Sequence, residues 1–589
     1  SSLIDSMDSK ACRLAYIEVN FMEYADVFRM IGISARDYFV KFAIPLVIIS
    51  FISSLLFYFI LGSLLGNMSF ILMLIPLFGI LLALLYPKVI ADKKRIEIDQ
   101  NLHLFITHIG VLSTAEVDRV ALFEKIAEKK EFEELANQAK KIVKLVRDWG
   151  LSLPEACKFQ AKRCPSKIFR DFLERFAYNI DAGQPVEEFL TAEQDVLMTE
   201  FETMYLNSLK DVDIFKDLFL SMILSIAFAV VFATILPALT GADPIFMLVI
   251  TLIFFTITET GFLYAMKTRI PNDPLWARFD TKTKSEREID FCIFIALIGV
   301  AILSVVVALM FMGKIPTILP LINKPMPLIM LLVLPLTPLM IPGMVSRKIE
   351  KILRERDKHY PSFIRSLGAA ETAKQTTTTH ALKTLQYKDF GALTEMVKNL
   401  YKRLNMRISQ EYSWKMFMRE CETFIIHRFS EMYMDARIKG GVPEKIGNII
   451  AKNVERINAL RMHRNQTTTT LIGVLYGITA SLAFALYVGI EVIELMANSL
   501  QVIDLSTPEG IPSASVVNLQ QYNIPQVNFI IAFLLIIHSM LSSVMIKIVD
   551  GGHQVNAYFH FVMMLWISAI SALATDIGIG SMIKIGEVV

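Results

Sequence analysis

The chain has 589 residues, of which 54% are hydrophobic and only 20% are charged, against about 25% charged residues in ordinary globular proteins. Its 59 Lys and Arg residues nearly balance its 57 Asp and Glu residues, and its five cysteines are too few for a disulfide framework. This composition excludes a disordered, collagen-like or disulfide-stabilised protein and gives no overall case for nucleic-acid binding, whereas it fits a membrane protein with sizeable aqueous domains.

Nine runs of predominantly apolar residues are long enough to cross a bilayer, which takes about 20 residues in a helix. The block before the first run, 1–41, is too long and too charged for a signal peptide and is predicted to be a cytoplasmic, partly amphipathic helix. Four prolines in the sixth run predict a kink there. The predicted spans are 42–64, 68–86, 218–239, 244–266, 291–312, 326–344, 471–491, 527–548 and 557–577.

Lys and Arg residues gather at alternate ends of these spans, which sets a predicted orientation by the positive-inside rule. Lys88 and its basic neighbours follow the second span, and Arg347 and its neighbours follow the sixth, whereas the opposite loops carry only Lys314 and Lys324. The N-terminus is therefore predicted to be cytoplasmic and the C-terminus external, with the chain in the plasma membrane. The predicted external loop 497–526 contains no Lys or Arg.

Two large charged blocks separate the hairpins of spans, and in both blocks apolar residues recur every three or four positions, which is the helical period. Each block exceeds 120 residues, enough for a small helical bundle. The sequence thus predicts an all-α polytopic membrane protein with about nine transmembrane helices and two duplicated cytoplasmic helical-bundle domains. Its predicted segments are the N-terminal helix 1–41, hairpin 42–86, helical domain 87–217, hairpin 218–266, short loop 267–290, hairpin 291–344, helical domain 345–466 and three C-terminal spans in 467–589.

The two helical blocks share motifs at an offset of 258 positions. Each begins with Phe-Ile-x-x-[Ile/Leu]-Gly and later carries Gly-x-Pro, and 73 residues separate the two motif glycines in both blocks. Equal spacing inside blocks of matching size predicts a duplication, with both halves in the same orientation. The residues that define the repeat are Phe105, Ile106, Gly110, Gly183 and Pro185 in the first block and Phe363, Ile364, Gly368, Gly441 and Pro443 in the second.

We interpret the repeated glycines as structural. Gly183 and Gly441 stand two residues before a proline, where a glycine in the left-handed conformation commonly ends a helix. Gly110 and Gly368 fall inside helical patterns, where close packing against a neighbouring helix would justify the cost of about 1 kcal/mol relative to alanine. The alternative interpretation is that these glycines line a binding site for a partner.

Motifs of catalysis are absent from the sequence. It contains no phosphate-binding loop, dinucleotide fingerprint, nucleophile elbow or zinc motif, so no catalytic, cofactor-binding or metal-binding residue is predicted. Two short threonine runs, 376–379 and 467–470, have the composition of helix starts. This interpretation fits the second run, which lies directly before the seventh span, whereas the sequence offers no account of the first. Glu259 is the clearest acid within a span; we interpret it as facing other helices, protonated or hydrogen-bonded, and a place in a conduction path is the alternative.

Duplicated helical domains between short hairpins, with Phe-Ile-x-x-[Ile/Leu]-Gly early and Gly-x-Pro late, resemble the type II secretion F domain family and in particular its long archaeal members, the archaellum assembly platforms. The resemblance covers roughly 37–577, and because its motifs are degenerate, the topology carries most of it. It implies a non-enzymatic membrane platform. A hexameric secretion ATPase would dock below this platform, and pilin-like subunits would enter a filament above it.

By this resemblance, the platform would couple the ATPase to the insertion of the pilin-like subunits and, in a motile filament, to rotation. We also expect a homodimer in contact with membrane lipids and no nucleic-acid partner. An adhesive type IV pilus or secretion platform is the alternative within this class. A multispan transporter is more distant, because it would concentrate polar residues at mid-membrane, whereas these spans are nearly free of them.

The two helical blocks differ in charge. The block 87–217 has 20 Lys and Arg against 24 Asp and Glu, whereas 345–466 has 24 against 13. Basic residues beside the bilayer fit anionic lipid headgroups, but those far from any span fit the acidic face of a partner. We predict that the ATPase docks on the second block, with lipid contact or plain solvation as the alternative. The candidate docking residues are Lys398, Lys402, Arg403, Arg407, Arg437, Lys439 and Lys445.

Overall fold

The computed structural model describes residues 27–32, 34–65, 74–115, 118–240, 244–316, 318–319, 324–375, 377–503 and 524–586. Most of the predicted N-terminal helix 1–41, most of the predicted loop 497–526, and Thr376 lie outside these residues. The chain forms two compact units, one of Ser1–Phe201 with Met432–Ile449 and the other of Glu202–Glu431 with Ile450–Val589. Each unit is described by itself.

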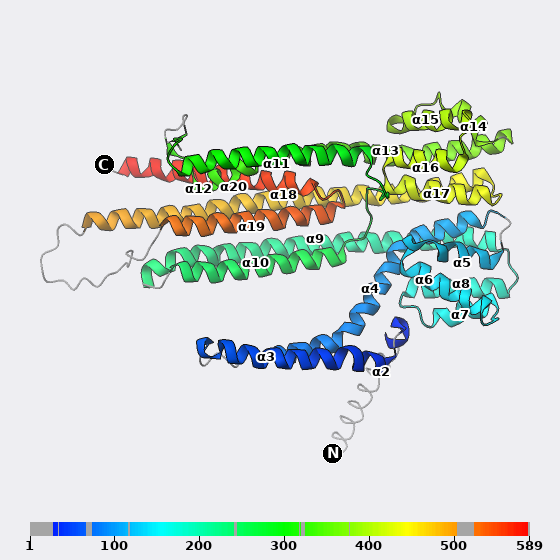
Figure 1. Ribbon diagram of the computed structural model, residues 1–589, viewed down its shortest axis with the longest axis horizontal. Helices are drawn as coiled ribbons and strands as arrows, with labels where there is room; N and C mark the ends of the chain where they lie inside the picture. Colours follow the sequence, from blue (N-terminus) through cyan, green and yellow to red (C-terminus); the bar gives the residue numbers. More distant parts are fainter. Residues whose placement is uncertain are drawn as a thin grey trace, which may run out of the picture. The chain divides into compact units, whose positions relative to one another are not determined.

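The described chain is helical apart from one pair of two-residue strands (Figure 1). Strand β1 (Ile318–Leu319) pairs with β2 (Lys324–Pro325) in antiparallel register, in the connection between the helices Lys284–Phe311 and Leu328–Val333. The helices of the first half are α2 (Ala35–Tyr38), the π-helix η1 (Phe39–Ala43), α3 (Ile44–Leu65), α4 (Leu74–Leu112), α5 (Arg119–Glu128), the 3₁₀ turn η3 (Lys130–Phe132), α6 (Glu134–Arg147), α7 (Leu153–Ala161), α8 (Lys167–Asp181), α9 (Val186–Thr240) and α10 (Pro244–Arg269).

The second half is built from the same kinds of element. Its helices are α11 (Lys284–Phe311), α12 (Leu328–Val333), the 3₁₀ segment η4 (Leu334–Leu339), α13 (Met340–Lys374), α14 (Thr378–Leu385), the 3₁₀ turn η5 (Gly391–Leu393), α15 (Thr394–Asn405), α16 (Gln410–Cys421), α17 (Phe424–Ile438), α18 (Pro443–Ile503), α19 (Ile524–Asp550) and α20 (Asn556–Gly586). The predicted all-α fold of a polytopic membrane protein is confirmed.

Eight described helices are long and apolar enough to cross a membrane. They match the predicted spans except 68–86, whose first residues lie outside the described ranges and whose remainder opens α4. The predicted irregularity of the sixth span is present, because Pro335 and Pro338 lie in η4, where the α-helix is replaced by a 3₁₀ segment between α12 and α13. Buried apolar side chains of α9, α10, α12, α18, α19 and α20 form one core in the second unit.

The same order of helices occurs in the two helical blocks and in the long helices that flank them. A long helix (α4 or α13) is followed by a short helix, a 3₁₀ turn, three more helices, and a second long helix (α9 or α18). We call α5 to α8 the first helix set and α14 to α17 the second helix set. Phe105 and Phe363 are fully buried at equivalent places, each edge-on to other aromatic rings. The repeated order supports the predicted duplication.

The glycines that end α8 and α17 correct one expectation. Gly183 has the left-handed φ of 72° after α8, as a helix-ending glycine requires, but after α17 the left-handed residue is Gly440, with φ 86°, and not Gly441. Gly441 is the next residue, whose N–H donates to Ala436 O at 2.9 Å. The left-handed glycines of the two turns, Gly183 and Gly440, are therefore 257 positions apart, one fewer than the 258 positions that separate the sequence motifs.

The two threonine runs also behave differently from their interpretation. Thr468, Thr469 and Thr470 lie inside α18, and each hydroxyl donates to the backbone carbonyl four residues earlier, so the prediction of a helix start there is wrong. No proline interrupts α18 between its first residue and Ile503, which lets the helix continue through the run. In the other run α14 begins at Thr378, after Thr377 as N-cap, whose side chain makes no capping hydrogen bond.

Candidate functional site: the charged junction of α13 and α18

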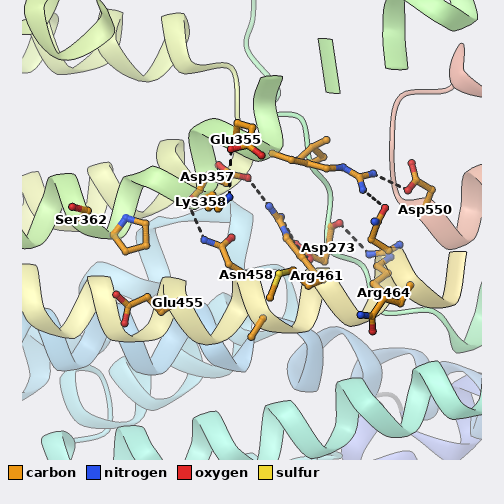
Figure 2. Close-up of a pocket in the computed structure, with 17 residues that line it drawn as sticks. Asp273, Glu355, Asp357, Lys358, Ser362, Glu455, Asn458, Arg461, Arg464 and Asp550 are labelled. Atoms are coloured by element: carbon orange, nitrogen blue, oxygen red, sulfur yellow. Dashed lines mark hydrogen bonds and ion pairs between the residues drawn. The ribbon is translucent and has the colours of Figure 1, made fainter. Parts of the chain in front are cut away.

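Charged residues of α13 and α18 meet two connecting segments in the second unit: the loop 270–275 after α10 and the turn 550–555 between α19 and α20. We call Asp273, Arg354, Asp357, Arg461, Arg464 and Asp550 the charged junction. They line a cavity of about 650 Å³ (Figure 2). The junction follows the predicted sixth span along α13 and precedes the predicted seventh span along α18.

Arg461 of α18 joins two acids. Its Nη1 lies 2.7 Å from Asp357 Oδ2 on α13, and its Nε lies 2.8 Å from Asp273 Oδ2 in the loop after α10. All three side chains are at most 15% exposed. Burial raises the pKa of Asp357 to about 6, although Arg461 acts in the opposite direction. The guanidinium therefore keeps a deeply buried carboxylate charged and ties α18 to α13.

Arg464, one turn further along α18, donates to four backbone carbonyl oxygens. It donates to Val549 O at 2.6 Å and Ile548 O at 3.3 Å, at the C-terminal end of α19, and also to the carbonyls of Pro271 and Asp273 at 3.4 and 3.2 Å. A cation at a helix C-terminus satisfies carbonyls that have no partner within the helix and interacts favourably with the helix dipole. Arg464 thus fastens α19 and the loop after α10 to α18.

The turn after α19 is shaped around these side chains. Gly551 has φ 73°, and a Cβ there would lie 2.7 Å from Arg464 Nη2, so both the backbone and the space require glycine. Asp550 accepts a hydrogen bond from Arg354 Nη2 at 2.7 Å. Glu350 of α13 accepts from the N–H of His553 at 2.5 Å. Burial, and then the nearby Asp550, raise the pKa of Glu350 to about 7.

The charged junction links α13 and α18 to two connecting segments. Its charges are bound to one another or to backbone groups, and they hold four separate chain segments together. Within the described ranges, no three His, Cys, Asp or Glu side chains converge as metal ligands would. The junction therefore joins helices that are long and apolar enough to cross a membrane.

Comparison with known proteins gives the family. The family of type II secretion system (T2SS) protein F matches residues 105–241, which run from the Phe105 motif to the end of α9. The flagella accessory protein J of Methanococcus voltae is 34% identical over 563 residues, covering 95% of this chain and 99% of the relative. The protein of the same name from Methanocaldococcus jannaschii is 34% identical over 554 residues, covering 94% and 97%. The chain belongs to the flagella accessory protein J family. No solved structure matches it.

Membership confirms the family that the sequence resembles and assigns the chain to the archaellum branch of the type II secretion F platforms. This family is non-enzymatic, in agreement with the prediction from the missing catalytic motifs. The chain is a multi-pass membrane protein, and membership implies partners from a secretion-type assembly.

The basic residues predicted to bind the ATPase fall into two groups in different compact units. On α15 and just after it, Lys398, Lys402 and Arg407 are exposed, and no ion pair joins them to another described residue. Arg403 differs, because it is half-buried and forms an ion pair with Glu420 of α16. Three exposed cations on one short element make a basic surface, which we call the α15 surface (Lys398, Lys402 and Arg407).

The second group lies at the turn between α17 and α18. Lys439 is exposed, whereas Arg437 donates to Gly441 O at 3.1 Å and so helps to close its own turn. Lys445 Nζ lies 2.6 Å from Glu187 Oε1 at the start of α9. Arg437 and Lys445 therefore have structural contacts that the sequence did not reveal, and the α15 surface is the better candidate for docking.

Glu259 meets a histidine inside the apolar core. Its Oε1 lies 2.5 Å from Nδ1 of His538 on α19, and Nε2 of that ring lies 3.2 Å from Thr479 Oγ1 on α18. All three residues are at most 1% exposed. The acid of α10 thus faces other helices, and a polar chain of three residues crosses from α10 through α19 to α18.

Sequence reasoning missed a buried pairing that both halves share. In the first half, Asp99 of α4 accepts a hydrogen bond from Ser166, the N-cap of α8. In the second half, Asp357 of α13 accepts one from Thr423, just before α17, which acts to lower the pKa of Asp357 against the effect of burial. The acids lie 258 positions apart and the hydroxyls 257. The repeat offset would have found these residues. A second signal was the sequence Asp-Gly-Gly-His at 550–553, a turn pattern directly after a span.

Proposed function

We propose that this platform couples a cytoplasmic hexameric secretion ATPase to the insertion of pilin-like subunits into an archaellum filament. The observation that carries the proposal is the continuity of α9 and α18. These helices have 55 and 61 residues, about 80 and 90 Å at 1.5 Å per residue, whereas crossing the hydrocarbon core takes about 30 Å. Each is a single helix with an aqueous part and a membrane part, and we infer that a movement of the aqueous part is passed to the span (Figure 1).

The charged junction supports this role. Arg461 and Arg464 lie on α18 immediately before its span, and they bind α13, the loop after α10 and the end of α19. A shift of α18 along or about its axis is therefore passed to these neighbours through short, buried contacts. Packed, charge-paired contacts of this kind switch between discrete arrangements instead of deforming gradually.

A break in α18 between its two parts tests the coupling. Thr469→Pro removes a helical hydrogen bond and costs about 3 kcal/mol locally, and the matched variant Thr469→Ala keeps the helix intact. Thr469 is exposed, so neither change disturbs the core. We expect the proline variant to bind the ATPase normally but to lose its stimulation of ATP turnover and its support of filament assembly. Normal assembly by a folded Thr469→Pro protein contradicts the coupling.

The ATPase is proposed to dock on the α15 surface, where long-range attraction would speed encounter with an acidic partner. Lys398→Glu with Lys402→Glu should weaken ATPase binding by on the order of tenfold at low salt and by less at high salt, where charges are screened. The control is Lys140→Glu with Lys144→Glu, which reverses two exposed lysines at the same spacing on α6, the equivalent helix of the first set. Equal weakening by both pairs excludes α15 as the specific site.

The proposed orientation places both helix sets in the cytoplasm, the N-terminus inside and the C-terminus outside. It rests on the distribution of Lys and Arg about the spans. In a chain without native cysteines, Asn67→Cys and Gly510→Cys, at positions outside the described residues, should react with an impermeant thiol reagent in intact cells. Trp149→Cys and Asn405→Cys, both exposed, should react only after lysis. Labelling of the second pair in intact cells would refute the orientation.

A further inference from the structure

The turn between α17 and α18 is held by residues of the first half. Asp435 on α17 accepts a hydrogen bond from Lys129 Nζ at 2.6 Å and lies 3.4 Å from His108 Nε2 on α4. A Cβ on Gly441 would lie 2.8 Å from Thr114 Oγ1, so the turn fits closely against the end of α4. All of these residues belong to the first compact unit. Lys129 of the first helix set and His108 of α4 therefore form a receptor that is filled by Asp435.

The equivalent turn of the first half is unfilled. Gly183 and Gly440 occupy the same place after α8 and α17, and that offset of 257 positions makes Tyr178 the counterpart of Asp435. Tyr178 is 74% exposed, and a Cβ on Gly183 would meet nothing within 4 Å. The surface that is buried around Asp435 is thus open around Tyr178.

The equivalent receptor of the second helix set is built but open. His108 corresponds to Ser366 at the offset of the Phe105 and Phe363 motifs. Like Lys129, Lys388 lies in the linker between the first short helix of its set and the 3₁₀ turn. Lys388 Nζ donates to Ser366 Oγ at 3.0 Å, and the adjacent Tyr387 is 85% exposed. An ammonium and a hydroxyl therefore stand together, as Lys129 and His108 do.

We propose that a second copy of this chain fills these two faces, with Tyr178 of one copy docked at the Lys388–Ser366 receptor of the other. The phenol oxygen accepts hydrogen bonds from the donors that flank it, in the place that the Asp435 carboxylate takes within the chain, and Tyr387 offers a ring for stacking. Each chain has one open turn and one open receptor, so two chains close on themselves through two identical contacts.

The charges of the helix sets favour this occupant. The block 87–217, which includes Tyr178, has more acids than bases, whereas 345–466, which includes Lys388, has 24 Lys and Arg against 13 Asp and Glu. Docking the first set of one copy on the second set of another therefore brings opposite charges together. The proposed contact between two chains rests on the homodimer expected for the platform. It does not depend on whether the platform binds an ATPase.

Cysteine crosslinking in native membranes tests the contact. Two differently tagged chains without native cysteines are coexpressed, one carrying Tyr178→Cys and the other Lys388→Cys. We expect oxidation to give a band of twice the chain mass that contains both tags. Met406→Cys, exposed elsewhere in the second half, replaces Lys388→Cys as the negative control. As the positive control, Lys129→Cys with Asp435→Cys in one chain should link without a change of mass. A Tyr178–Lys388 band no stronger than the Met406 band overturns the proposal.

A charge rescue supplies the second measurement. Tyr178→Lys places a cation against Lys388 and should lower the dimer fraction in mild detergent at least fivefold by light scattering, and adding Lys388→Glu should restore it. A Tyr178→Lys protein that remains dimeric refutes this interface. Binding of the ATPase is measured on the same samples. If the crosslinked dimer forms but does not bind the ATPase, the interface is supported and the proposed ATPase partner is refuted. If the ATPase binds but the crosslink does not form, the ATPase partner is supported and the interface is refuted.

Discussion

Replacing Arg461 with methionine should be strongly destabilising, because it removes the cation that bridges the buried Asp357 and the largely buried Asp273. The Asp357 side chain is 2% exposed and that of Asp273 is 10% exposed, so neither carboxylate can recover its lost partner from water. Breaking a buried ion pair by removing one partner costs about 3–5 kcal/mol. We expect Arg461→Met to lie in this range.

The loss should grow with pH. The pKa of Asp357 is already raised by burial to about 6, from an unfolded value near 3.9, and Arg461 opposes that rise. A folded pKa above the unfolded one means that the folded state binds more protons in the window from about pH 4 to 6, so stability falls as pH rises through it. Without Arg461 the pKa rises further and the window extends upward. The difference between variant and wild type should therefore be larger at pH 8 than at pH 5.5.

Thermal unfolding in detergent, followed by a thiol-reactive dye, measures both effects, since Cys421 on α16 is fully buried until the fold opens. The matched control is Arg365→Met, which breaks the ion pair with Glu455; those side chains are 46% and 50% exposed, so the cost should be 0–1 kcal/mol. Adding Asp273→Asn and Asp357→Asn to Arg461→Met should recover stability, because no buried charge is then left unpaired. Equal losses for Arg461→Met and Arg365→Met, or a loss independent of pH, would refute the reasoning.

Three other contacts predict the effect of single substitutions. Gly551→Ala should lower the free energy of unfolding by about 2 kcal/mol, because the backbone φ of 73° and the Arg464 guanidinium both disfavour a Cβ at this position. Gly473→Ala, where a Cβ would meet nothing within 4 Å, should not destabilise the protein. Equal melting temperatures of the two variants would contradict this prediction. Glu259→Leu should cost about 1 kcal/mol in detergent unfolding through the lost contact with His538, and Glu259→Gln less. Asp435→Ala should destabilise the protein at pH 7 but not near pH 2. The hydrogen bonds from His108 and Lys129 overcome burial and lower the pKa of Asp435 to about 2, so the stability that this carboxylate contributes is present above about pH 4 and disappears as pH falls toward 2. A stability difference between variant and wild type that stays constant from about pH 7 to about pH 2 would count against this prediction.

The membrane helices were predictable because their signal is local. A span needs about 20 apolar residues in one run, and a sliding comparison along the chain finds them without any knowledge of their neighbours. An irregular segment at Pro335 and Pro338 was predictable for the same reason, since proline removes a helical donor wherever it stands. Family membership was equally accessible, because the order of spans and helical blocks persists where individual motifs are degenerate.

The charged junction was not predictable because its signal is not local. Arg461 is 188 residues from Asp273 and 104 from Asp357, and nothing near any of them marks a partner. The threonine run at 467–470 failed differently. A threonine hydroxyl serves equally well as an N-cap or as a donor to the carbonyl four residues earlier, and only the uninterrupted course of α18 decides between them.

The two halves of the repeat show which positions the fold constrains and which it leaves to partners. The acid is kept in both, as the half-buried Asp99 and the buried Asp357, each hydrogen-bonded to a hydroxyl at the start of the fourth short helix. A change on one side would leave the other polar group without its partner. Exposed positions carry no such penalty, and there the halves have diverged: Asp435 is matched by Tyr178, and a basic α15 surface faces solvent. Divergence on the surface over a preserved interior is the pattern expected when one duplicated module has to bind different partners at its two copies.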